Sequence, residues 1–276
     1  MRTFAIFVGL ILAALAAVAV LAYPAWLAAA PLLEEPRFHR VASRLGMLAL
    51  VAGFVLCARR LRLSDRASLG YGIPRRKFVR ELGVGLGFGV ALMLPIIALM
   101  IAIDLRDLKP GVALDVATLA RLVVKGLVTG LAVAFIEETF LRGAMFTGIA
   151  RESGARLAIL LTSLLYAAAH FFAKTRIPAD EVGWTSGIDL LAGWLLDFGR
   201  PLAIVDSFLC LFAVGVLLAS IRAITGNIAA CIGLHAGWVL IITSVRELSV
   251  PDTRHGWSFL VGTYDGFVGW LVLAWT

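Results

Sequence analysis

Charge is scarce in this chain: only 16% of its 276 residues are Asp, Glu, Lys or Arg, while 61% are hydrophobic. Soluble domains carry about 25% charged and about 45–50% apolar residues. The composition therefore excludes an ordinary soluble domain and indicates a polytopic membrane protein. Because helices satisfy their own backbone polar groups inside a bilayer, we predict an all-α transmembrane helical bundle.

Cysteine is also scarce. The three cysteines, Cys57, Cys210 and Cys231, all fall in apolar segments. An odd count without metal-ligand spacing argues against a disulfide framework or a cysteine metal site, and we expect these side chains to pack as small hydrophobes.

Linkers, repeats and low-complexity tracts are missing as well, so we predict one membrane-embedded domain over residues 1–276. At about 20 apolar residues per span, the length suits roughly eight spans. The apolar run that begins at Phe4 far exceeds the 7–15 residues of a signal-peptide core, which favours a retained first span. Region 187–198 is too short to cross and is expected to be re-entrant or interfacial. The spans are expected near residues 4–31, 41–58, 79–103, 119–149, 156–173, 202–221, 227–245 and 258–275.

The formal net charge of +7 is concentrated in one loop, where residues 59–80 carry eight Lys or Arg side chains. Basic loops stay on the cytoplasmic side, so this loop predicts topology and no nucleic-acid partner is expected. With eight spans, both termini are then cytoplasmic. We expect a multi-pass protein of a bacterial plasma membrane, with the lipid bilayer as its surroundings.

Three charged side chains interrupt the apolar segment 127–149: Glu137, Glu138 and Arg142. Ionisable residues within a membrane span are costly and mark functional sites by default. Glu138 and Arg142 are separated by four positions, the spacing at which an acid and a base meet on a helix. Glu137 is turned about 100° from Glu138 and is free to face another partner.

Two histidines are predicted to reach the depth of these carboxylates. Glu137 precedes the turn near residue 153 by 16 residues, and His170 follows it by 17. At 1.5 Å per helical residue, antiparallel neighbours place the two side chains at nearly equal depth. His235 lies about ten residues beyond the next turn on the same side. We therefore expect the three to converge, with Glu137 as a general base that activates a water.

The pattern resembles a known family. Glu137-Glu138-x-x-x-Arg142, then an aromatic-x-x-x-His ending at His170, then His235 resemble the CPBP family, which comprises type II CAAX prenyl endopeptidases and bacteriocin-processing or Abi-like immunity proteins. The resemblance covers about residues 119–245. It implies an intramembrane endopeptidase, a hydrolase acting on a peptide or protein substrate. By resemblance Glu137 activates water with His170, Glu138 and Arg142 support the site, and His235 polarises the scissile carbonyl or binds a metal or water.

Two positions depart from the family pattern. Tyr166 stands where the second motif usually begins with Phe, and Val239 stands where the third motif usually has Asn or Asp. The missing polar side chain bears on the oxyanion hole, where one donor is worth about 100–1,000-fold in rate.

Metal dependence is open from the sequence. Glu137, His170 and His235 have the ligand types for zinc or another divalent metal with an open position for water. The chain lacks His-Glu-x-x-His, the spacing that indicates zinc strongly. A metal-free mechanism, in which Glu137 and His170 activate the water, accounts for the same residues.

Two other functions remain open at this stage. Intramembrane Glu, His and Arg also serve in transporters and proton relays. The departure at Val239 is compatible with a catalytically inactive immunity or scaffold member of the same fold.

Overall fold

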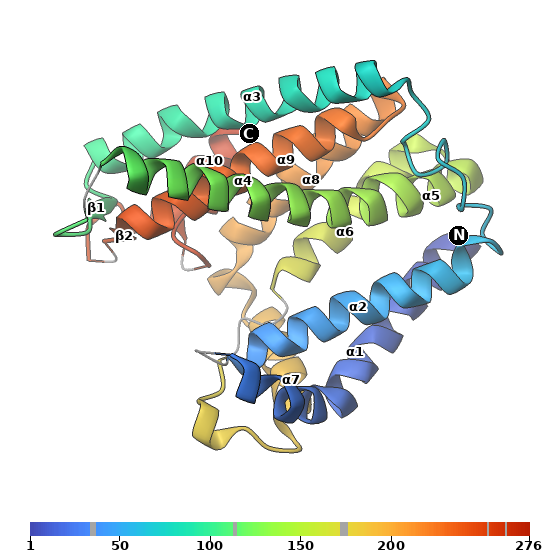
Figure 1. The fold of residues 1–276 in the computed structure, drawn as a ribbon, viewed down its shortest axis with the longest axis horizontal. Helices are drawn as coiled ribbons and strands as arrows, with labels where there is room; N and C mark the ends of the chain where they lie inside the picture. Colours follow the sequence, from blue (N-terminus) through green and yellow to red (C-terminus); the bar gives the residue numbers. More distant parts are fainter. Residues whose placement is uncertain (34–36, 113–114, 172–175, 253, 263) are drawn as a thin grey trace.

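The computed structural model describes residues 1–276 except 34–36, 113–114, 172–175, 253 and 263, and helices dominate the described part. The predicted all-α transmembrane class is confirmed (Figure 1). The helices are α1 (Arg2–Ala29), α2 (Phe38–Ala58), α3 (Arg75–Ala102), α4 (Val116–Glu138), α5 (Phe146–Ser153), α6 (Ala155–His170), α7 (Ser186–Phe198), α8 (Val205–Thr225), α9 (Ala229–Leu248) and α10 (Trp270–Trp275). Strands β1 (Arg106–Leu108) and β2 (Ser249–Pro251) pair antiparallel.

Six helical stretches of the described chain are long and apolar enough to cross a membrane. They are α1 with its extension to Leu32, α2, α3, the continuous stretch from α4 through α5, α8 and α9. The helix α6 has 16 residues and falls among the shorter apolar helices. The predicted short helix near 187–198 is observed as the 13-residue α7, which lies beside α1.

The predicted span over 258–275 is wrong. The described residues there form a 3₁₀ helix, Ser258–Val261, and the six-residue α10. Gly262 and Gly266 between them have φ of 60° and 74°, a left-handed region that interrupts a right-handed helix. The Asp265 carboxylate also accepts hydrogen bonds from the next backbone amides, those of Phe267 and Val268. The predicted count of eight spans therefore loses the support of an eighth span at the C-terminus. The placement of both termini on one side of the membrane followed from that count and loses the same support.

The helices form two groups in Figure 1. The first contains α3, α4 and α9 side by side, with α6 and α8 next to them, and α9 packs extensively against both α3 and α4. The second contains α1, α2 and α7. The chain between α4 and α5 belongs to a buried apolar cluster that also includes residues of α1, α6 and α8.

Glycines bring the backbones of α3, α4 and α9 close together. A Cβ atom at Gly233 of α9 would lie 2.0 Å from the Leu82 carbonyl oxygen of α3. On the other side of α9, a Cβ atom at Gly130 of α4 would lie 2.6 Å from the Ala236 carbonyl oxygen. Small residues allow such approach between membrane helices. The backbone of α9 is thereby fixed on both sides around His235.

The C-terminal segment is tied to the two-stranded sheet through a buried arginine. The Arg106 guanidinium donates to the Gly266 carbonyl oxygen at 2.8 Å and to the Ser249 hydroxyl at 3.0 Å, and it lies 4.0 Å from the centre of the Phe267 ring. These contacts hold residues 264–268 against the end of α9.

Candidate active site

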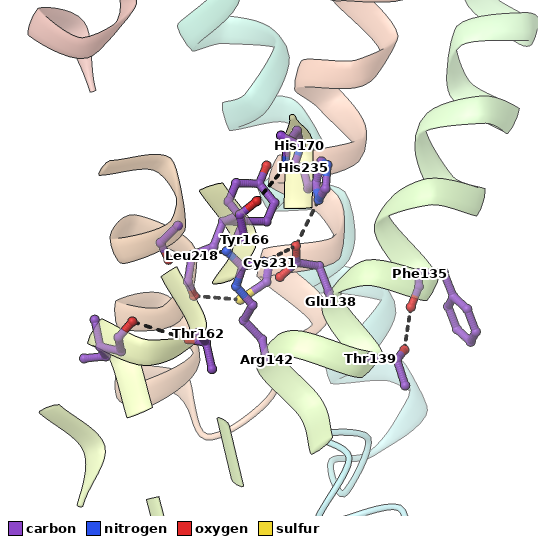
Figure 2. Close-up of polar contacts among 12 residues, drawn as sticks. Phe135, Glu138, Thr139, Arg142, Thr162, Tyr166, His170, Leu218, Cys231 and His235 are labelled. Carbon is purple, nitrogen blue, oxygen red and sulfur yellow. Dashed lines mark hydrogen bonds and ion pairs between the residues drawn. The ribbon is translucent and has the colours of Figure 1, made fainter. Parts of the chain in front are cut away.

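A buried ion pair joins the end of α4 to the segment that follows it. Glu138 and Arg142 are both 0% exposed, and Glu138 Oε1 accepts a hydrogen bond from Arg142 Nη1 at 3.1 Å (Figure 2). This is the pairing expected from their spacing. Residues Thr139–Met145 form a π-helical turn within the long helix. Such turns are rare and are frequent at functional sites.

The same carboxylate oxygen also receives His235 of α9, whose Nδ1 lies 2.9 Å from Glu138 Oε1. A carboxylate paired with arginine is ionised and only accepts, so His235 Nδ1 carries the proton in this contact. Nε2 is the ring nitrogen left for other partners. One oxygen of Glu138 therefore links Arg142 and His235, and through them α4 and α9.

The helix α6 contributes Tyr166 and His170. His170 Nδ1 lies 2.8 Å from the Tyr166 carbonyl oxygen, which only accepts, so Nδ1 carries a proton and Nε2 is left with a lone pair or a second proton. The Tyr166 ring lies 4.3 Å from the His170 ring and 6.2 Å from the His235 ring, centre to centre. The Arg142 guanidinium lies over the Tyr166 ring at 4.5 Å. Side chains from α4, α6 and α9 thus meet around Tyr166 (Figure 2).

Glu137 is placed differently from the sequence-based expectation. It is half-buried near the end of α4, and its Oε2 is buried without a hydrogen-bond partner among the described residues. The carboxylate that contacts His235 belongs to Glu138. The expectation that Glu138 pairs with Arg142 alone, while Glu137 faces both histidines, is therefore wrong for His235. The reason is geometric, because a single oxygen of Glu138 accepts from both partners. The free oxygen of Glu137 remains available.

Side chains that the sequence reasoning did not single out hold this arrangement from α8. Arg142 Nη2 approaches the Gly215 carbonyl oxygen at 3.4 Å, and Arg222 donates to the Arg142 carbonyl oxygen at 3.0 Å and to the Thr147 hydroxyl at 3.1 Å. Arg222 is a second buried arginine in an apolar helix. Its position in a span was the signal that could have identified it, by the same argument used for Arg142.

The C-terminal segment reaches the site through Tyr264, whose hydroxyl donates to the His170 carbonyl oxygen. Burial raises the pKa of the Tyr264 phenol, which keeps its proton for this bond. The adjacent Asp265 pairs with Arg246 of α9 at 2.6 Å. The role of Tyr264 was missed because residues 258–275 were interpreted as a membrane span.

A cavity of about 480 Å³ opens beside the two histidines, between α3, α8, α9 and the C-terminal segment. Tyr166, His170 and His235 line it, and most of its remaining lining is apolar. Val239, one turn after His235, also faces it. Concave, mostly apolar sites with a few convergent polar groups are typical of ligand-binding sites.

The described side chains do not fit the expected metal set. Among them, no group of three or more His, Cys, Asp or Glu residues is placed to hold a metal ion. The set Glu137, His170 and His235 is therefore not supported as a metal site.

Residues 119–241 match the family model described as type II CAAX prenyl endopeptidase Rce1-like. No curated protein and no solved structure matches the chain. The matched segment, a little under half of the chain, runs from α4 into α9 and contains both glutamates, both histidines, Tyr166 and the two buried arginines of the site. The match supports an integral membrane enzyme of the protease class. The resemblance indicated by the motifs is thereby confirmed over residues 119–241, which are similar to the Rce1-like type II CAAX prenyl endopeptidases.

Proposed function

We propose that this protein is an intramembrane endopeptidase that hydrolyses a peptide bond of a membrane-associated substrate. The observation that carries the proposal is that His235, hydrogen-bonded to the Glu138–Arg142 pair, and His170 both line one mostly apolar cavity. The Rce1-like match over the same residues supports it. A peptide segment in this cavity would lie with one carbonyl near the histidines.

In the proposed reaction, Glu137 acts as the general base. Its carboxylate takes a proton from a water as the water oxygen adds to the scissile carbonyl carbon, and the carbonyl π electrons move to oxygen. When the tetrahedral intermediate collapses, the C–N bond breaks and Glu137 returns the proton to the leaving nitrogen. Peptide and water become a carboxylic acid and an amine. The buried Glu137 Oε2, without a partner among the described residues, is free to receive that water.

The histidines have separate parts in this proposal. His170, with Nδ1 bonded to the Tyr166 carbonyl, presents Nε2 to orient the water beside Glu137. His235, with Nδ1 bonded to Glu138, presents Nε2 toward the scissile carbonyl. Glu138 and Arg142 position His235 and do not themselves react.

The experiment uses the full-length protein purified in lipid nanodiscs. Two probes are a farnesylated peptide ending in Cys-aliphatic-aliphatic-X and the same peptide without the prenyl group, with products identified by mass spectrometry. Glu137→Gln is expected to lower the cleavage rate by at least about 100-fold, because general acid–base catalysis contributes about 10²–10⁴-fold. Glu181→Gln, the same change at an exposed glutamate of a short 3₁₀ helix, is the matched control and should cleave like the parent.

Equal cleavage by the parent and Glu137→Gln would contradict the proposed role of Glu137. Binding of either peptide without cleavage by the parent protein would instead favour the inactive immunity or scaffold alternative. Cleavage of the farnesylated peptide alone would assign the substrate to the prenylated class.

A further inference from the structure

On the cavity wall supplied by α9, the residue one turn after His235 carries no hydrogen-bond donor. His235, Val239 and Thr243 follow one another at intervals of four residues, and all three line the cavity. The isopropyl group of Val239 has no donor. Thr243 is eight residues from His235, which is about 12 Å along the helix. Apart from His235 itself, the one donor that the described part of α9 offers to this cavity within a turn of His235 is the indole N–H of Trp238, three residues on.

Two other donors that line the cavity are already bonded. The Tyr264 hydroxyl donates to the His170 carbonyl oxygen, and the Arg246 guanidinium is paired with Asp265 at 2.6 Å. The Tyr264 hydroxyl has one proton and could donate to a developing oxyanion only by giving up its present partner, and Arg246 lies eleven residues, roughly 16 Å along α9, from His235.

Tyr166 offers a donor whose ring contacts both histidines. Its side chain is 4% exposed and lines the cavity, and its hydroxyl makes no hydrogen bond within the described part of the chain. Figure 2 shows this hydroxyl at the end of the ring nearest the two histidines. Contacts with Arg142 at 4.5 Å and with the His170 and His235 rings fix the orientation of the ring. A phenol is protonated at neutral pH and donates one hydrogen bond.

We propose that the Tyr166 hydroxyl is a catalytic donor that stabilises the oxyanion of the tetrahedral intermediate, compensating for the absence of a donor at Val239. The inference rests on the proposed endopeptidase function. No bond to the phenol forms or breaks: the O–H stays intact while its hydrogen bond to the carbonyl oxygen strengthens as negative charge develops. Arg142, over the ring face, draws electron density from the phenol and makes it a better donor.

Packing alone would also explain a buried aromatic ring, so the test must isolate the hydroxyl. Tyr166→Phe retains the ring, its contacts with both histidines and its contact with Arg142, and deletes one oxygen. We expect kcat to fall by about 100–1,000-fold, the value of one oxyanion-hole donor, with KM changed less than about threefold. Thermal unfolding should be unchanged. Tyr23→Phe, the same deletion in α1 at a ring packed on Trp184, is the matched control and should keep the parental kcat.

A rescue variant separates a donor role from a structural one. Tyr166→Phe combined with Val239→Asn places a side-chain amide on the α9 wall of the cavity, one turn from His235. If the site lacks only a donor, this double variant should regain at least about tenfold in kcat over Tyr166→Phe alone.

The outcomes are distinguishable. If the parent cleaves and Tyr166→Phe keeps kcat within about threefold, the inference about Tyr166 is overturned while the proposed function stands. If kcat falls and the double variant regains nothing, the hydroxyl does not act as a replaceable donor and the inference is also overturned. If the parent cleaves neither probe peptide, the proposed function and this inference fail together.

Discussion

The helices α1 and α9 are both long enough to cross a bilayer, but their hydropathy and their burial within the protein differ in opposite directions. The most apolar window of α1 has a mean hydropathy of 2.9 and is 17% buried within the protein, whereas that of α9 has a mean hydropathy of 1.5 and is 50% buried. The more apolar helix is thus the less buried one. In a membrane protein, strong hydropathy marks contact with lipid, because lipid chains are as apolar as leucine side chains.

The difference follows from what each helix packs against. The exposed face of α1 carries large apolar side chains such as Leu12, Val20 and Leu27. Glycines of α9 admit the α3 backbone, glycines of α4 admit the α9 backbone, and His235 of α9 is buried. Small and polar residues therefore identify the interior of the bundle better than hydrophobicity does.

The largest expected loss of stability comes from breaking the buried ion pair that joins α4 to α9. Arg142→Met leaves the Glu138 carboxylate inside the bundle without its cation. Breaking a buried pair on one side costs about 3–5 kcal/mol. Thermal unfolding in detergent, followed by tryptophan fluorescence, should show a marked fall in midpoint.

The double variant Glu138→Met with Arg142→Met should regain part of that stability, because no unpaired charge is then buried. If Arg142→Met were as stable as the parent, the buried Glu138–Arg142 pair would contribute no more to stability than a lipid-exposed surface does.

Backbone approach is expected to give the next largest effect. Gly233→Leu in α9 forces a side chain into the Leu82 carbonyl oxygen, which no rotamer relieves, and overpacking costs about 1–3 kcal/mol. Gly9→Leu in α1 is the matched control, since no atom lies within 4 Å of a Cβ added there. The unfolding midpoint of Gly233→Leu should fall well below that of Gly9→Leu; equal midpoints would remove the distinction between the two helices.

The smallest effect is expected at an exposed end of α4 and α9. Lys125 and Glu247 form an ion pair at 2.5 Å, but their side chains are 54% and 45% exposed. Lys125→Gln should change the free energy of unfolding by only about 0.2–1 kcal/mol, and less at high salt. A loss as large as that of Arg142→Met would mean that membership of α9, and not burial, determines the effect.

The sequence predicted the parts of this molecule that follow from local rules. Composition predicted the helical class, the i, i+4 spacing predicted the Glu138–Arg142 pair, and counting residues from the turns predicted that His170 and His235 approach the same centre. Each of these needs only helix geometry and the cost of charge in lipid.

Other features depended on tertiary contacts that spacing does not encode. Which glutamate meets His235 depends on how α4 is rotated against α9, and one carboxylate oxygen accepts from both Arg142 and His235. The tail was misassigned because its hydropathy was weighed above its glycines, although Gly262 and Gly266 end the helix there. Tyr264 was lost with that misassignment.

The π-helical turn at Thr139–Met145 has a consequence for comparing sequences by helical wheel. Each hydrogen bond of such a turn spans one residue more than in an α-helix, and one residue corresponds to about 100° of rotation. The stripe of side chains before Thr139 and the stripe after Met145 are therefore out of phase. A single wheel drawn over residues 116–153 therefore superposes two different faces. A one-residue deletion within the turn would rotate Thr147 and Glu152 relative to Glu138, although the segment would remain one continuous apolar run.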